Sequence, residues 1–149
     1  MRFAVVAALA CVCLWPADAE AACNVSVWSS VSFGTYDVFA AAPLDSAGRI
    51  GYRCDQGHNY TIRISITRGQ ASSYSARALH SGTDVLQYNL FLDAARTVVW
   101  GDESEGTQAY YDSGVGLSRD NIPLFGRVYP GQDIRAGVYS DSVMVVIDF

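Results

Sequence analysis

Apolar and polar residues alternate strictly at residues 60–67, and apolar residues follow the same period at residues 24–34 and 143–149. Successive side chains of a β-strand point to opposite faces, so this period predicts strands with one face in a core and the other in water. The alternating apolar residues are Tyr60, Ile62, Ile64 and Ile66 in the first stretch, Val25, Val27, Val31 and Phe33 in the second, and Val143, Val145, Ile147 and Phe149 in the third.

Residues 86–93 fit two patterns. A helical stripe would run through Val85, Tyr88 and Leu92, and a strand face would run through Leu86, Tyr88, Leu90 and Leu92. The neighbouring residues are rich in β-branched and aromatic side chains, which favour a strand. We therefore predict a strand here.

Shorter strand candidates lie at residues 50–53, 98–100 and 122–129. No segment keeps a helical period over several turns. Turn-rich stretches separate the candidates, at Asp112-Ser113-Gly114, Pro130-Gly131-Gln132 and Ser81-Gly82-Thr83. About seven short strands at this spacing predict an all-β fold with the architecture of a β-sandwich.

The first 21 residues have the features of a secretory signal peptide. Met1 and Arg2 precede an apolar run at residues 3–14, and the small residues that follow allow cleavage after Ala19 or Ala21. The run has 12 residues, too few for a helix to cross a hydrocarbon core of about 30 Å. We expect an exported protein with no membrane anchor and a single domain at residues 22–149.

The charge balance excludes several classes of function. All ten basic residues are arginine, against 15 acidic residues, and the formal net charge is −5. An acidic chain has no broad positive field for nucleic acid or an anionic membrane. The absence of lysine from the sequence excludes Walker-type phosphate binding, Schiff-base chemistry and lysine isopeptide cross-links. We expect no nucleic-acid partner.

Cys23 and Cys54 are the cysteines that remain after cleavage. In an exported chain such an isolated pair is expected to form a disulfide. Closing a loop of 32 residues would stabilise the fold by roughly 3 to 4 kcal/mol. His58 and His80 form no metal-binding pattern with these cysteines. We expect a disulfide, no metal and no cofactor.

Catalytic patterns are incomplete. Asp112-Ser113-Gly114 resembles a loop that aspartic proteases need in two copies, and the chain has one, so we interpret it as a turn. A serine triad is formally open, but no nucleophile elbow supports it. The acidic stretch at 102–106 lacks the ligand pattern of a calcium loop and is interpreted as a solvated loop. Tyr110 and Tyr111 are assigned to a loop, and we expect no enzymatic activity.

A series of short motifs follows one order along the mature chain, from Cys23 to Phe149. The motifs are Phe33-Gly34-x-Tyr36-Asp37 between the cysteines, then Tyr88-Asn89-Leu90-Phe91-x-Asp93, Trp100-Gly101-Asp102, Phe125-Gly126-Arg127 and Gly137-x-Tyr139-x-Asp141-x-Val143. Each motif is weak alone, but the ordered set resembles the spore coat protein U domain family. Members of this family are secreted subunits of archaic chaperone–usher pili.

The resemblance implies an incomplete, immunoglobulin-like β-sandwich of the pilin type, which lacks its last strand and is completed by donor-strand complementation. It implies as partners a periplasmic chaperone, an outer-membrane usher and neighbouring pilus subunits. It also implies secretion through the periplasm to the cell surface, in a pilus (fimbrium) or a spore coat, with a role in adhesion and biofilm formation. The residues expected to line the open groove are Val143, Val145, Ile147, Phe149, Val25 and Val27.

One to three residues separate Cys23 from the predicted cleavage sites. A donor strand that fills four or five pockets needs about ten residues at about 3.3 Å each. We therefore expect a subunit that accepts a strand and donates none, such as a minor or tip-like subunit or a coat component. Two alternatives stay open: a self-complete secreted β-sandwich binding module, and a small secreted hydrolase that depends on His58 or His80.

Overall fold

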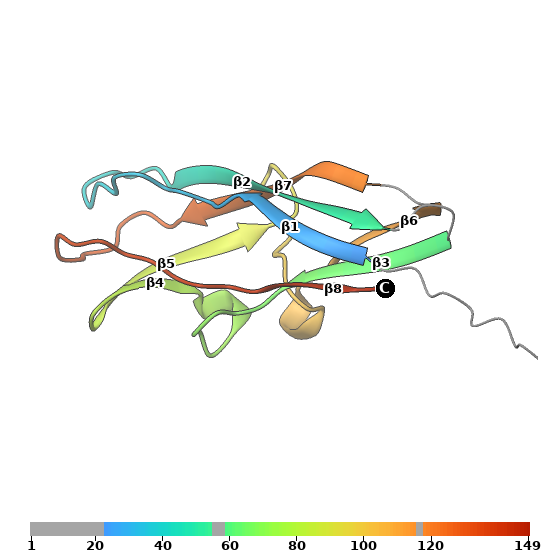
Figure 1. The fold of residues 1–149 in the computed structure, drawn as a ribbon. Helices are drawn as coiled ribbons and strands as arrows, with labels where there is room; N and C mark the ends of the chain where they lie inside the picture. The colour runs from blue at the N-terminus through green and yellow to red at the C-terminus, as the bar shows by residue number, and fades with distance from the viewer. Residues whose placement is uncertain (1–22, 55–58, 116–117) are drawn as a thin grey trace, which may run out of the picture.

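The structure is a computed structural model that describes residues 23–54, 59–115 and 118–149. In these residues, antiparallel strands form two sheets that enclose one core (Figure 1). The strands are β1 (Cys23–Ser29), β2 (Leu44–Cys54), β3 (Asn59–Ile66), β4 (Ala78–Ser81), β5 (Asp84–Phe91), β6 (Tyr110–Val115), β7 (Ser118–Val128) and β8 (Val145–Asp148). The all-β expectation is confirmed.

The helical segments of the described residues are two single 3-10 turns, η1 (Tyr74–Ala76) and η2 (Ser104–Gly106). No helix in this part of the chain is long and apolar enough to cross a membrane. The predicted signal peptide with its cleavage sites, and His58, lie outside the described residues.

The larger sheet has the strand order β1-β2-β7-β5-β4. β2 and β7, of 11 residues each, pair at its centre. Both are longer than the sequence predicted, which was residues 50–53 and 122–129. The first half of β2 was missed because Ser46, Ala47 and Gly48 show no apolar period. Its later residues follow the pattern, and Ile50 is fully buried.

The smaller sheet has the order β6-β3-β8. β3 pairs with both neighbours, and its alternating residues Ile62, Ile64 and Ile66 are all 0% exposed. The strand predicted at residues 60–67 is therefore confirmed. The C-terminal strand is also present, as β8, in a shorter form than the predicted one.

The turn predicted at Asp112-Ser113-Gly114 was wrong, as was the loop assigned to Tyr110 and Tyr111. All five residues lie in β6, which pairs with β3. The apolar alternation that would have indicated this strand is interrupted, because the half-buried position 112 carries a polar residue, aspartate. Its Oδ2 accepts a hydrogen bond from the hydroxyl of buried Tyr52 over 2.6 Å. A carboxylate with such a partner can replace an apolar residue on an inner face.

Residues 84–91 form β5, as predicted for residues 86–93, with Leu86, Tyr88 and Leu90 in the core. In place of the strand predicted at residues 98–100, Val99 and Trp100 form isolated bridges. Trp100 is fully buried there, and its indole Nε1 donates to the carbonyl of Ile64 over 2.9 Å. This bond anchors the 98–100 segment to β3.

The predicted disulfide joins Cys23 to Cys54. It links the first residue of β1 to the last residue of β2, and the two cysteines are also partners in the ladder between these strands. β1 lies at the edge of the larger sheet, with β2 as its one neighbour. The covalent bond therefore secures an edge strand to the centre of the fold.

Candidate functional site

A groove lies between two segments outside the strands, at one end of the sandwich. Residues 30–39 continue from β1, and residues 134–141 lead toward β8 (Figure 1). The groove has a volume of about 890 Å³. We call the two segments the first wall and the second wall. The larger sheet supplies an apolar floor between them, made of Leu44, Leu79, Leu86 and Val128.

The walls are almost free of sheet pairing. No residue of the first wall belongs to a ladder, and in the second wall Ser140 alone forms a bridge, with His80. Main-chain N–H and C=O groups require hydrogen-bond partners when they are buried. Apart from that bridge, both walls present backbone groups that no strand of the described residues engages through a ladder.

Two glycines allow the first wall to cross the larger sheet at close range. A Cβ on Gly48 would lie 3.0 Å from the carbonyl carbon of Ser30 and 3.1 Å from the backbone nitrogen of Val31. A Cβ on Gly126 would lie 2.6 Å from Cγ1 of Val31 and 2.8 Å from Cζ of Phe33. A larger side chain at either position would push the wall away from the sheet, because such contacts are too close for carbon atoms.

Large apolar side chains at the groove remain in water. Phe39 on the first wall is 93% exposed, and Val138 on the second is 88% exposed. Val31, Phe33, Ile134 and Tyr139 are only partly buried against the core. Contiguous exposed apolar surface on a soluble protein commonly marks a site of interaction. The groove therefore has the surface character of a binding site.

Asp141 places one carboxylate on the second wall. The hydroxyl of Tyr88 donates to its Oδ2 over 2.8 Å. Burial raises the pKa of Tyr88, and the bond to Asp141 raises it further. The tyrosine therefore keeps its proton as a donor, and the bond fixes this part of the second wall to β5.

The six groove residues expected from the sequence lie where the walls continue into β1 and β8, and other residues line the groove described above. The two strands approach each other, with no ladder between them in the described residues. Val25, Val143, Val145 and Ile147 are half-buried against the core, whereas Phe149 is 63% exposed and Val27 is 57% exposed.

Sequence reasoning missed the residues that line the groove, although its motifs contained several of them. Phe33 and Tyr36 belong to one motif, and Tyr139 and Asp141 to another. The motifs are far apart in the sequence, and nothing in either indicates that the two segments face each other. The pairing of wall with wall depends on the strand order of the two sheets.

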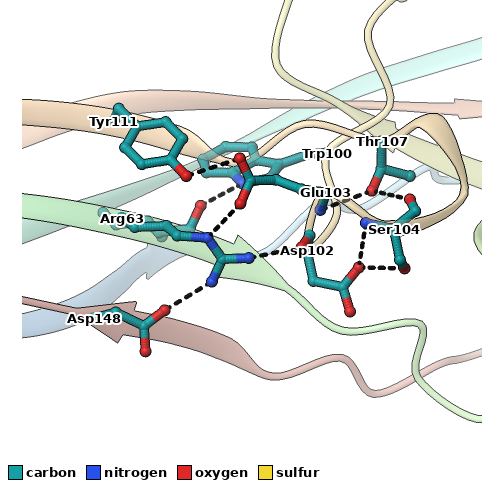
Figure 2. Close-up of polar contacts among 9 residues, drawn as sticks. Arg63, Trp100, Asp102, Glu103, Ser104, Thr107, Tyr111 and Asp148 are labelled. Atoms are coloured by element: carbon teal, nitrogen blue, oxygen red, sulfur yellow. Dashed lines mark hydrogen bonds and ion pairs between the residues drawn. The ribbon is translucent and has the colours of Figure 1, made fainter.

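A polar network holds β8 to its sheet on the outer side (Figure 2). Arg63 of β3 donates to Oδ2 of Asp148 on β8 over 2.7 Å and to Oε2 of Glu103 over 2.8 Å. The hydroxyl of Tyr111 donates to the other oxygen of Glu103 over 2.8 Å. The bonds from Tyr111 and then Arg63 lower the pKa of Glu103, and the two carboxylates raise the pKa of Arg63.

The acidic stretch at 102–106 is exposed, as expected of a solvated loop, but it is also bound to the sheet. The guanidinium of Arg63 donates to the carbonyl of Asp102 over 2.7 Å. Among the described residues there is no cluster of histidine, cysteine and acidic side chains that could hold a metal. His80 reaches Ser140 through backbone hydrogen bonds.

Comparison with known families identifies the chain. Residues 8–146 match the model of the spore coat protein U domain. The chain belongs to the spore coat protein U domain family. A curated relative, Protein U of Myxococcus xanthus, is 29% identical over 147 residues, which cover 89% of this chain and 80% of the relative. The family is structural, so the expectation of no enzymatic activity agrees with it.

The fold of this spore coat protein U domain also occurs in a solved structure. One chain in the crystal structure of the CsuC–CsuE chaperone–tip adhesion subunit pre-assembly complex, from archaic chaperone–usher Csu pili of Acinetobacter baumannii, superposes with a TM-score of 0.56 at 22% identity. The match covers 87% of this chain and 40% of that chain, so this chain spans less than half of its length. The likeness supports the predicted immunoglobulin-like class of sandwich.

Proposed function

We propose that this protein is a structural subunit of a cell-surface assembly, a pilus or a spore coat, and that it accepts a β-strand from a partner into the groove. One observation carries the proposal: two walls that lie outside the strands run along an apolar floor, with no strand between them in the described residues. Membership of the spore coat protein U domain family supports the structural role.

A donated strand would pair with the backbone groups of the walls and cover the exposed apolar side chains at the same time. Its backbone would supply ladder partners to the walls, and alternate side chains would cover the apolar floor. The predicted groove residues on β1 and β8 would extend the site beyond the walls, since these strands are edges of the two sheets. An unpaired edge beside exposed apolar surface promotes aggregation until a partner covers it.

The proposed partners are a periplasmic chaperone, an outer-membrane usher and neighbouring subunits. The support is that the solved complex with this fold is named as one between a chaperone and a tip adhesion subunit of chaperone–usher pili. Passage through the periplasm is supported by the predicted signal peptide. The proposed place of action is the cell surface.

We further propose a minor or tip-like position, with a role in adhesion and biofilm formation, in which the subunit accepts a strand without donating one. The support is the short sequence between the predicted cleavage sites and Cys23. Mixed with polymerising subunits, the mature chain should then cap fibres without extending them. Homopolymers formed by the mature chain alone would contradict this part of the proposal.

The test of strand acceptance is the mature chain with a linked peptide of about ten residues with alternating apolar side chains, appended after Phe149. The chain without the peptide should aggregate, and the linked peptide should give a soluble monomer with a higher melting temperature, because the linker makes binding intramolecular. A peptide of the same length with Asp at the alternating positions is the control.

A pair of substitutions localises the effect to the groove. Val31→Asp places a charge at a half-buried position of the first wall and should abolish the gain from the peptide, because a buried charge without a partner is costly. Ser32→Asp adds the same charge at the neighbouring exposed position and should preserve the gain. A soluble, stable monomer without the peptide, unchanged by its addition, would mean that the sandwich is already complete.

A further inference from the structure

Tyr36 joins the two sides of the groove through one hydroxyl group. Tyr36 lies on the first wall, and the turn at residues 129–132 leads into the second. The hydroxyl donates to the carbonyl of Tyr129 over 3.1 Å and accepts from the backbone N–H of Gln132 over 3.0 Å. Tyr36 and Gln132 are 96 positions apart in the sequence, so the contact exists only in the folded chain.

The side chain of Gln132 takes the place of a strand residue at the end of the larger sheet. β7 ends at Val128, opposite Tyr88 of β5. At the next position of β5, Gln87 donates its N–H to Oε1 of Gln132 over 2.6 Å and accepts from Nε2 over 2.9 Å. A residue on an opposite antiparallel strand makes the same reciprocal pair of bonds. The turn that precedes the second wall is therefore fixed to β5.

The two sets of bonds form one unit. Nε2 of Gln132 also donates to the carbonyl of Tyr129 over 2.7 Å, the same oxygen that accepts from Tyr36. Within the described residues, no other hydrogen bond joins residues 30–39 to residues 129–141. Because ladders do not set the separation of the walls, this contact is the hydrogen-bonded tie between them.

We propose that Tyr36 and Gln132 are positioning residues that clamp the two walls at a fixed separation and so hold the groove ready for a strand. The inference rests on the strand-accepting function proposed above. Without the clamp, the walls would adopt a range of separations, and a donor would have to order them as it binds. Preorganisation of this kind strengthens binding by lowering the entropy lost in the complex.

The test compares Tyr36→Phe with Thr97→Val in the chain that carries the appended apolar donor. Both changes remove one hydroxyl group, but the hydroxyl of Thr97 donates to Oδ2 of Asp93 over 2.8 Å, outside the groove and its walls. Hydrogen–deuterium exchange is measured on the donor, on residues 134–141 and on β3.

Tyr36→Phe removes both hydrogen bonds of the hydroxyl. It should speed exchange of the donor amides about three- to tenfold, as expected when part of the free energy of these neutral bonds is lost from local opening. Exchange in β3 should not change, whereas a purely structural role would speed exchange in β3 and the donor together. Thr97→Val should leave the donor amides at the unmodified exchange rate. Gln132→Leu, which removes the amide but keeps the backbone N–H, should speed donor exchange by a smaller factor.

Amide exchange at residues 134–141 distinguishes an error in the proposed clamp from an error in the proposed strand acceptance. If the donor amides of the unmodified protein show no protection, strand acceptance is wrong. The clamp is still measured by these wall amides, which should exchange faster in Tyr36→Phe than in Thr97→Val. Equal rates in the two variants, at the wall and the donor alike, would overturn the clamp.

Discussion

β3 and β8 are neighbours in one sheet, with Ile64 directly opposite Ile147, yet the two isoleucines differ in burial. Ile64 is 0% exposed, whereas Ile147 is only partly buried. β3 has a strand on each side, and β8 has β3 on one side and no ladder on the other among the described residues. Two strands with the same alternating pattern thus differ in burial because one has neighbours on both edges.

The centre of the larger sheet and the groove also differ in how completely their backbone groups are paired. β2 and β7 pair along most of their length, while the segments at residues 30–39 and 134–141 lie outside the strands and form a single bridge. An edge strand loses half of its possible backbone pairs and part of its apolar cover. In this protein the two walls that lack ladders line one groove, and they carry its two most exposed large apolar side chains, Phe39 and Val138.

The largest effect is expected from the disulfide that secures β1, the edge strand with one neighbour. Replacing Cys23 and Cys54 together with Ala should lower the free energy of unfolding by roughly 3 to 4 kcal/mol. Urea unfolding of the donor-linked chain measures this loss. Intact-mass measurement before and after reduction should show the bond in the unmodified protein, and two alkylatable thiols in the non-reduced protein would contradict it.

The contrast between β3 and β8 is tested by the two opposed isoleucines. Ile64→Ala should lower the free energy of unfolding by about 3 kcal/mol, because it opens a cavity in a closed part of the core. Ile147→Ala should lower it by about 1 kcal/mol, because this side chain is only partly buried. Linking the apolar donor should increase the cost of Ile147→Ala and leave that of Ile64→Ala unchanged. Equal costs in urea unfolding without the donor would show that β8 is as enclosed as β3.

A smaller, pH-dependent effect is expected from the network that holds β8. Glu103 has a folded-state pKa below its ordinary value of 4.5, because of Tyr111 and Arg63. Its contribution to stability is therefore present above about pH 4.5 and lost as the pH falls through the folded-state pKa. In Arg63→Met, the midpoint of urea unfolding should depend less on pH over this acidic range. The same change should speed amide exchange in β8.

Arg127→Met is the matched control for the network, because Arg127 pairs with Asp45 on the larger sheet. It should leave amide exchange in β8 unchanged. Equal acceleration of β8 in both variants would mean that the Arg63 contacts do not hold this strand specifically.

The smallest effect is expected at the histidines. Replacing His58 and His80 together with Ala should leave assembly and surface attachment unchanged, because His80 binds the second wall through its backbone, over 2.8 Å and 3.1 Å to Ser140. Fibre or coat assembly measured by electron microscopy would test this. A folded double variant that lost a measurable activity would support the hydrolase alternative.

Local chemistry made much of the fold predictable. The alternation at residues 60–67 identified β3, and the isolated cysteine pair identified the disulfide. β6 was missed because an inward carboxylate at Asp112 depends on Tyr52, which is 60 positions away. β4 was missed because four residues carry too little pattern. These failures arise where a side chain's surroundings come from distant parts of the chain.

The sequence by itself determined the all-β class, the paired cysteines and the ordered motifs of the family, since each depends on residue types and short spacings. The tertiary structure alone decided which edges stay unpaired and which residues face the groove. Strand order places residues 30–39 beside residues 134–141, and Tyr36 beside Gln132. Contacts across about a hundred residues depend on how both sheets are assembled, and alternation within one strand carries no information on its neighbours.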